Sequence, residues 1–540
     1  MADNRRIEIY DTTLRDGTQA LGVSLSLIDK LRIVEHLDTL GVDYIEGGYP
    51  LSNPKDTAFF EQAGKTDFKH AKVCAFGMTR RRGADPADDA GMKALVGAHA
   101  PVITIVGKTW DLHVDQVLRV DRDENLAMIR ESVTFCRENS ETGDVFYDAE
   151  HFFDGLAANA QYALSTLTAA VEGGACRVIL CDTNGGSLPG WITEAVGRVQ
   201  SHLGGEVTLG IHTHNDSGLA TANSLAGIKA GCAQVQGTIN GIGERCGNAD
   251  LTTIIANLRL KLGYDCLQDG TSGGGLRNLT ETSRFVYEVA NMNLVAGQPF
   301  VGTAAFAHKG GMHVHAVQRV TRSYEHVEPE SVGNARQVLI SELSGASNIA
   351  ATLGEKFNIG DDKDLQRAVL QRVQDLENQG YQFEDARASF ELLLHELRGD
   401  RPEFWQLDHY RCVILKRHGE EAVTEAIVRM SVDSQDRHEV SAGDGPVNAL
   451  DGALRKCLLP AYPQLANVHL RDYKVRVVNA KAESAAKVRV AVQFAVLNQA
   501  GVAGEHFTTI GVNENIVDAS WQAITDAFGY YLIEEPQAGS

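Results

Sequence analysis

Eight short β-rich runs alternate with helix-length segments over the first 260 residues, and this repetition restricts the fold more than any other feature. The runs span residues 6–11, 42–48, 72–77, 101–107, 144–150, 176–182, 207–214 and 233–241. Between the first two, apolar residues recur at helical spacing and Gly41 supplies a stop; the residues are Leu27, Leu31, Val34 and Leu37. Eight βα units in a segment of this length predict a (β/α)8 TIM barrel. A doubly wound sheet is the alternative, but the chain has no glycine-rich dinucleotide fingerprint.

After residue 265 the alternation stops, and three further segments follow. Residues 266–345 begin with the glycine-rich "QDGTSGGGLRN" and contain a histidine-rich, loop-like stretch, so we expect a linker subdomain. Residues 346–405 carry helical patterns and predict a helical subdomain. Residues 411–540 return to β-rich runs with two interleaved helical stretches. The chain is therefore expected to be an α/β protein, with its barrel in residues 1–265 and a separate C-terminal α/β domain.

Composition excludes several classes of protein. The net charge of −21 argues against a nucleic-acid surface, which needs clustered Lys and Arg, although a metal and local cations could still bind an anionic substrate. Nine scattered cysteines without a CxxC pair indicate reduced thiols. No apolar segment is long enough to span a membrane, and the N-terminus carries no signal-like region. We expect a soluble, cytoplasmic protein with no nucleic-acid or membrane partner.

Polar side chains gather where the predicted barrel strands end. They are Arg15, Asp16, Glu46, Glu150, Asp182, Thr183, His212, His214, Glu244, Arg245 and Asn248. Barrel enzymes build their active sites at this carboxyl-terminal face, whereas charges placed at random would fall at both ends. The clustering therefore indicates an active site.

His212 and His214 stand one residue apart, so in a strand both side chains face the same way. A hydrogen-bonded histidine pair is one explanation. With Asp16 they make a mixed oxygen and nitrogen ligand set, which suits Mn²⁺, Mg²⁺ or Zn²⁺ with positions open for substrate. Arg15 would stabilise an anionic oxygen beside that ion, and such a site would polarise the carbonyl of a chelating 2-oxo acid.

Several motifs resemble the isopropylmalate, homocitrate and citramalate synthase family. They are "DTTLRDGTQ" (11–19), "HTHND" (212–216) and "NGIGERCGNADL" (240–251), and the resemblance continues through "AAFAHKGGMHVHAV" (304–317) into the C-terminal domain. "EGGYPLSNPKD" (46–56) and "YDAEHFFDG" (147–155) look like the citramalate branch. The resemblance implies a metal-assisted Claisen condensation of acetyl-CoA with a 2-oxo acid, followed by thioester hydrolysis, with pyruvate as the acid and isoleucine biosynthesis as the route.

The resemblance also implies roles for the site residues. Asp16, His212, His214 and Asn248 would hold the metal, although Asn248 could instead cap the next helix. Arg15 would contact the substrate oxygens and the developing enolate. Thr183 would donate a hydrogen bond to the carboxylate of the 2-oxo acid, and Glu150 would be a polar catalytic partner. His313, with Tyr324, would act as the general acid or base.

Other residues keep open alternatives. Glu46 and Asp182 could brace loops or ligands rather than take part in the reaction. Cys246 lies where related lyases place a reactive cysteine, but its context, "GERCGN", resembles the synthases and indicates packing. The family often shows an acidic residue where His315 stands, which argues against copying a proton relay from relatives.

Selection of pyruvate requires bulk that excludes larger 2-oxo acids. Candidate pocket residues are Phe76, Met78, Ile105 and Tyr147, each of which could equally be ordinary barrel core. Isopropylmalate synthesis from 2-oxoisovalerate, for leucine, is the nearest alternative activity. A metal-dependent aldolase or lyase is an alternative of another class, and an amino-acid-sensing protein with an inactive barrel is a third.

For residues 411–540 the resemblance implies a regulatory and dimerisation domain with an amino-acid effector at the interface of a homodimer. Gly443 and Gly445 would permit a close approach, and Pro446 suits the first turn of the helix that follows. A helix N-terminus can receive a carboxylate. A plain dimerisation module is the alternative.

Overall fold

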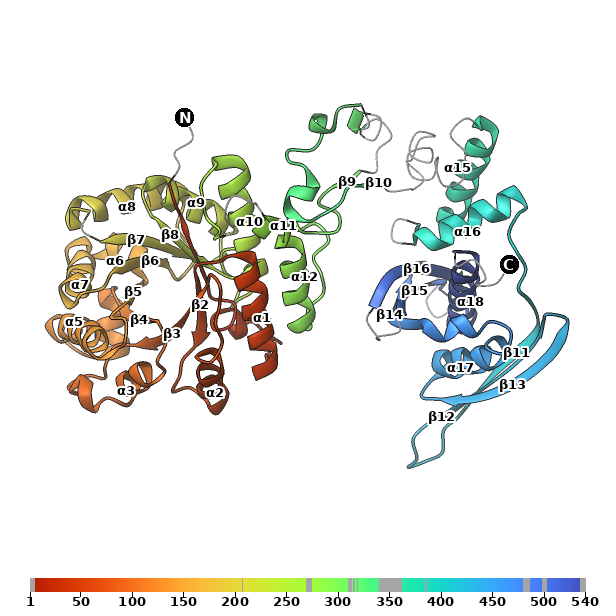
Figure 1. Ribbon diagram of the computed structural model, residues 1–540, viewed down its shortest axis with the longest axis horizontal. Coiled ribbons are helices and arrows are strands. Elements are labelled where there is room, and N and C mark those ends of the chain that lie inside the picture. Colours follow the sequence, from red (N-terminus) through yellow and green to blue (C-terminus); the bar gives the residue numbers. More distant parts are fainter. Residues whose placement is uncertain are drawn as a thin grey trace. The chain divides into compact units, whose positions relative to one another are not determined.

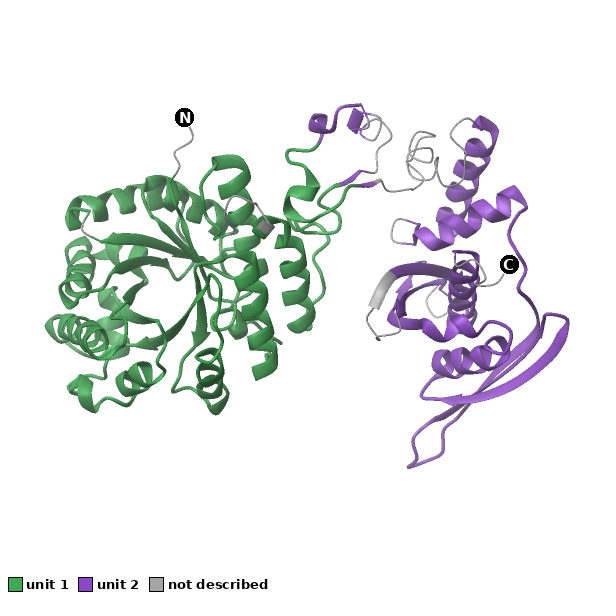
Figure 2. Ribbon diagram, in the orientation of Figure 1, with its two compact units in different colours: residues 1–306, 325–336 green, residues 307–324, 337–540 purple. Residues whose placement is uncertain are grey.

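The computed structural model describes residues 5–205, 207–268, 274–308, 313, 316–317, 319–338, 362–383, 386–478, 486–497 and 503–534. The chain divides into two compact units (Figure 2). Residues 1–306 and 325–336 form the first unit, and residues 307–324 and 337–540 form the second.

The first unit is built on a closed barrel of eight parallel strands in chain order, surrounded by helices (Figure 1). The strands are β1 (Glu8–Asp11), β2 (Tyr44–Gly48), β3 (Lys72–Met78), β4 (Val102–Lys108), β5 (Val145–Glu150), β6 (Arg177–Asp182), β7 (Thr208–Thr213) and β8 (Gln234–Gly237). Each strand coincides with one of the eight predicted runs, give or take a few terminal residues. The predicted (β/α)8 fold is confirmed.

Helices follow the strands around the outside of the barrel. They include α1 (Leu27–Leu40), α2 (Pro54–Ala63), α3 (Ala90–Gly97), α4 (Asp111–His113), α5 (Arg122–Asn139), α6 (Phe152–Ala158), α7 (Ala160–Gly173), α8 (Pro189–Leu203), α9 (Ala220–Ala230) and α10 (Leu251–Asn257). In α1 the predicted apolar stripe faces the core, and a capping box between Ser26 and Asp29 starts the helix. Gly41 ends it in the left-handed conformation (φ 90°), as its position predicted.

Alternate residues of each barrel strand face the interior or the surrounding helices. Phe146 belongs to the interior cluster, whereas Tyr147 is fully buried in the core between barrel and helices. Its ring packs beside Gly107 of β4, where a Cβ would lie 2.7 Å from the Tyr147 hydroxyl. Ile105 belongs to the same outer core. The predictions that Tyr147 and Ile105 line the substrate pocket are therefore wrong, because both point away from the barrel interior.

After the barrel, α11 (Gly274–Arg277) and α12 (Leu279–Val289) complete the first unit. A buried polar network joins this part to the loop after β8. The Gln298 amide nitrogen donates to Asn240 at 3.2 Å and to Asp250 at 3.3 Å, and Tyr287 donates to the Gln298 carbonyl oxygen at 3.0 Å. The post-barrel segment therefore supports the loop that carries Asn248.

The second unit contains β9 (Ala307–His308), β10 (Gln337–Val338), α15 (Lys363–Asn378), α16 (Arg387–Arg398) and a C-terminal pair of sheets. The first sheet is β11 (Trp405–Leu415), β12 (Val423–Val432) and β13 (Gln435–Gly443), followed by α17 (Pro446–Leu458). The second is β14 (Val468–Val477), β15 (Val488–Leu497) and β16 (Ala503–Asn513), followed by α18 (Ile516–Glu534). In this sheet β14 pairs with β15 in the antiparallel sense. The first strand starts at Trp405, ahead of the expected boundary at residue 411.

Within the described ranges, no helix is both long and apolar enough to cross a membrane.

Candidate metal centre

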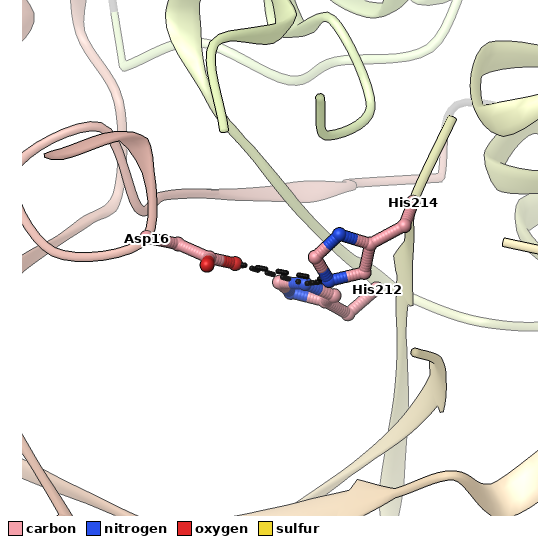
Figure 3. A group of neighbouring side chains, drawn as sticks. All are labelled: Asp16, His212 and His214. Carbon is pink, nitrogen blue, oxygen red and sulfur yellow. Dashed lines mark hydrogen bonds and ion pairs between the residues drawn. The ribbon is translucent and has the colours of Figure 1, made fainter. Parts of the chain in front are cut away.

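Three side chains converge at the carboxyl ends of the barrel strands (Figure 3). Asp16 comes from the loop after β1, while His212 and His214 lie at the end of β7. Asp16 Oδ2 lies 3.3 Å from His212 Nε2 and 3.9 Å from His214 Nε2, and the two Nε2 atoms are 3.2 Å apart. All three side chains are buried. Two imidazole nitrogens this close cannot both carry protons, so the contact suits either one hydrogen bond between them or a cation that both nitrogens ligate.

The local electrostatics favour a cation at this point. Burial alone would raise the pKa of Asp16, but Arg15 and the two imidazoles hold it well below its usual range. Burial and the neighbouring His212 lower the pKa of His214 to about 3. At neutral pH the site therefore presents an ionised carboxylate and a neutral imidazole, the forms that ligate metals.

Asn248 lies beside this group. Its backbone forms a bridge with His214, and its side-chain amide packs against Gly243, where a Cβ would lie 2.1 Å from the amide nitrogen. The side-chain oxygen Oδ1 of Asn248 is buried and has no hydrogen-bond partner among the residues that the structure describes, an arrangement that is unfavourable unless a ligand completes it. The alternative role as a helix cap is filled by Asp250, which accepts a hydrogen bond from the Thr252 backbone.

Arg15 is held against the same group by two neighbours. Its guanidinium is hydrogen-bonded to Glu46, which also accepts a hydrogen bond from Tyr10 at 2.8 Å. The guanidinium carbon lies 4.0 Å from the centre of the Phe76 ring. Burial would lower the pKa of Arg15, but the charges of Glu46 and Asp16 raise it. Glu46 therefore positions Arg15, and Phe76 of β3 lies next to the candidate metal site.

Thr183 directly follows β6, and Glu150 is the last residue of β5. The Thr183 hydroxyl oxygen accepts a hydrogen bond from the His151 backbone at 2.8 Å, which leaves its own proton free to donate. Glu150 forms an ion pair with Lys108, the last residue of β4. Lys108 was not predicted, although its place at a strand end, like that of the other polar residues, could have identified it.

Asp182 has a bracing role. It accepts hydrogen bonds from the hydroxyl and the backbone of Ser187, at 2.8 and 3.3 Å, on the outer side of the strand. Arg245 makes two hydrogen bonds to Asp216, each 2.8 Å long, and donates to the Thr183 carbonyl oxygen. Cys246, the next residue, is exposed, so the interpretation of Cys246 as a packing residue is wrong. These contacts fix the loops around the site.

Asp148 and Gln236 were missed by the sequence analysis. Asp148 lies two residues before Glu150, so the strand period alone would have placed it on the same interior face. Burial first, and then the charge of Glu46, raise the pKa of Asp148 to about 7. Both residues are buried, and Gln236 contacts His212 and Asp148.

His313 and Tyr324 belong to the second unit. Their rings stack, with centroids 4.2 Å apart and planes inclined by 26°. Both side chains are exposed. His315 lies outside the described residues.

Comparison with known families gives three consecutive matches. Residues 6–286 match the HMGL-like family, residues 300–381 match the homocitrate synthase post-HMGL domain-like family, and residues 384–532 match the LeuA allosteric (dimerisation) domain.

Among curated relatives, the (R)-citramalate synthase of Geobacter sulfurreducens is 48% identical over 97% of each chain. That of Aquifex aeolicus is 47% identical over 99% of each chain. A 2-isopropylmalate synthase of Sulfolobus acidocaldarius is 33% identical over 72% of this chain and 95% of its own length.

We predict that His212→Ala and His214→Ala each weaken Mn²⁺ binding by more than about 100-fold. Each removes a direct ligand, whereas losing an outer partner of a ligand costs about 10–100-fold. Equilibrium binding to metal-stripped protein, followed by the electron paramagnetic resonance signal of free Mn²⁺, measures the effect. His202→Ala, at the exposed end of α8, is the control. Unchanged affinity in both site variants would contradict the metal assignment.

Proposed function

The chain belongs to the HMGL-like family, in the branch of the (R)-citramalate synthases, and on that premise we propose that it is an acyltransferase that condenses acetyl-CoA with pyruvate. The products are (R)-citramalate and free CoA. The observation that carries this proposal is the set of (R)-citramalate synthases that are 41% to 48% identical over at least 97% of the chain. The converging Asp16, His212 and His214 side chains fit the chemistry.

The reaction needs acetyl-CoA to be deprotonated at its methyl group and the ketone of pyruvate to be polarised. A base removes a methyl proton from acetyl-CoA, the resulting enolate carbon attacks the ketone carbon of pyruvate, and water then cleaves the thioester to release CoA. A divalent metal at Asp16, His212, His214 and Asn248 would act as a Lewis acid toward the 2-oxo acid. Mn²⁺, Mg²⁺ and Zn²⁺ all suit this donor set, and we propose one of them.

The surrounding residues bind and orient the substrates. Arg15 stabilises negative charge on the substrate oxygens, because its guanidinium is fixed by Glu46 close to Asp16. The Thr183 hydroxyl donates to the carboxylate of the 2-oxo acid. Glu150, paired with Lys108, provides a polar partner at the edge of the site. His313, supported by Tyr324, supplies the acid/base group.

Phe76 provides the bulk that selects pyruvate. Its ring is held beside Arg15, whereas Met78, on the same strand face, is half exposed and contributes less. A larger 2-oxo acid such as 2-oxoisovalerate would need the space that the Phe76 ring fills. Because a 2-isopropylmalate synthase is among the relatives, 2-oxoisovalerate is the second candidate substrate.

We predict the highest kcat/KM for pyruvate in a panel with 2-oxobutyrate, 2-oxoisovalerate and 2-oxoglutarate, measured as free CoA released from acetyl-CoA. Phe76→Ala should lower the ratio of kcat/KM for pyruvate to kcat/KM for 2-oxoisovalerate by about 10–200-fold, the range for a one-methylene difference in a hydrophobic pocket. Met78→Ala is the matched control. Preference of the native enzyme for 2-oxoisovalerate would overturn the proposal in favour of isopropylmalate synthesis. Product cleavage without thioester hydrolysis would indicate a lyase.

We predict that His313→Ala lowers kcat by about 10²–10⁴-fold, the range for loss of a general acid or base, with little change in 2-oxo acid binding. Exchange of deuterium into the acetyl methyl group of acetyl-CoA reports proton removal directly. His308→Ala, in the same histidine-rich segment, serves as the comparison. Exchange at the native rate in His313→Ala would exclude His313 as the base.

The match of residues 384–532 to a dimerisation domain supports an oligomer, and we propose a homodimer that binds an amino-acid effector. The start of α17 suits a carboxylate. Gly445 occupies the N-cap with no side-chain cap, and Pro446 is the first helical residue. A Cβ at Gly443 would lie 2.4 Å from the Asn448 side chain, so glycine is needed there.

Isoleucine or leucine is therefore expected to lower the activity of the full-length enzyme without competing at the metal. A chain ending near residue 400 should lose this inhibition. Ultracentrifugation of the shortened chain would show whether its subunits still associate. Absence of inhibition by either amino acid in the full-length enzyme would leave this domain with a structural role alone.

A further inference from the structure

Gln236 is placed by the barrel register next to a candidate metal ligand. It is the partner of His212 across the parallel pairing of β7 and β8, and its side chain points into the barrel interior. Gln236 is fully buried and Asp148, on β5, is nearly so. A hydrogen-bonded chain therefore runs from β7 through β8 to β5, across the inside of the barrel.

The direction of these hydrogen bonds follows from the groups that make them. The Gln236 amide nitrogen donates to Asp148 Oδ1 at 3.1 Å, since an amide nitrogen can only donate. The amide oxygen of Gln236 then faces His212 Nδ1 at 2.9 Å. An oxygen can only accept, so His212 carries its proton on Nδ1. In the neutral imidazole the lone pair is then on Nε2, the nitrogen that faces Asp16 and His214.

We propose that Gln236 and Asp148 are positioning residues that fix the tautomer and the ring orientation of His212 and so set the affinity of the metal centre. This inference rests on the metal site of the proposed function. Imidazole ligands commonly donate their second ring proton to a carboxylate or carbonyl group, and such partners raise metal affinity. Here the amide of Gln236 links the imidazole to a carboxylate on a strand that is not a neighbour of β7.

The same strand supplies a matched control. Gln234 lies two residues before Gln236, faces the same interior and is equally buried. Its amide nitrogen donates to Glu8 at 3.1 Å, near the amino-terminal ends of the strands, where Glu8 forms an ion pair with Arg177. Replacement of either glutamine removes a buried amide from β8, but only Gln236 contacts a candidate ligand.

The test measures Mn²⁺ affinity of the full-length, metal-stripped protein by electron paramagnetic resonance, independently of turnover. Gln236→Leu should weaken binding by about 10–100-fold. Gln234→Leu should change it by less than about threefold, with circular dichroism confirming that both variants are folded. Equal affinities for native protein and Gln236→Leu, or equal losses in the two leucine variants, would overturn the inference.

A double variant tests the hydrogen-bond chain itself. In Asp148→Asn with Gln236→Glu, the new amide donates to the new carboxylate, which accepts from His212 Nδ1, and the total charge is unchanged. Affinity should return to within about threefold of the native value, whereas a loss as large as in Gln236→Leu would contradict the proposed chain. If the native protein itself bound no Mn²⁺, the metal centre would fail rather than its positioning residues.

Discussion

The two-residue period of a β-strand, combined with closure of the barrel, is the constraint on which the site depends. It places both His212 and His214 on the interior face of β7, so their Nε2 atoms meet at 3.2 Å. Closure pairs β8 with β1, and the loop after β1 therefore brings Asp16 beside them. In an open sheet of the same order, β1 and β7 would lie six strands apart. The ligand set thus follows from the fold, with no distortion of the strand that carries the histidines.

Much of this arrangement could be predicted from the sequence, because the relevant signals are local. Each barrel strand is a short apolar run, and each helix has its own start and stop, as the Ser26 capping box and Gly41 illustrate. His212 and His214 share a face by spacing alone. Asp16 required only the rule that strand ends meet at one face of a barrel. Local rules therefore identify the strands and the three converging side chains.

The errors arose where the decisive information is not local. An aromatic residue can fill the barrel interior or the layer outside it, so bulk alone did not separate Tyr147 from Phe146. Counting back from Glu150 would have placed Asp148 inside and Tyr147 outside. The pairing of Asp148 with Gln236 joins residues 88 positions apart, and no sequence spacing predicts it. The stacking of His313 on Tyr324 likewise follows from no regular spacing in the sequence.

Local charge explains why this site would need a cation to bind an anionic substrate. Arg15 faces Glu46 and Lys108 faces Glu150, so each of these positive charges already has a carboxylate partner. Asp16 adds a negative charge, because its low pKa keeps it ionised. A divalent ion held by Asp16 and two neutral imidazoles would give this ligand set a positive charge, opposite in sign to the carboxylate of a 2-oxo acid. Buried carboxylates would otherwise repel the substrate carboxylate across a medium of low dielectric constant. Asp16, His212 and His214 would hold the ion, which would supply both a binding site for the acid and Lewis-acid polarisation of its ketone, so that substrate binding and carbonyl polarisation depend on the same three side chains.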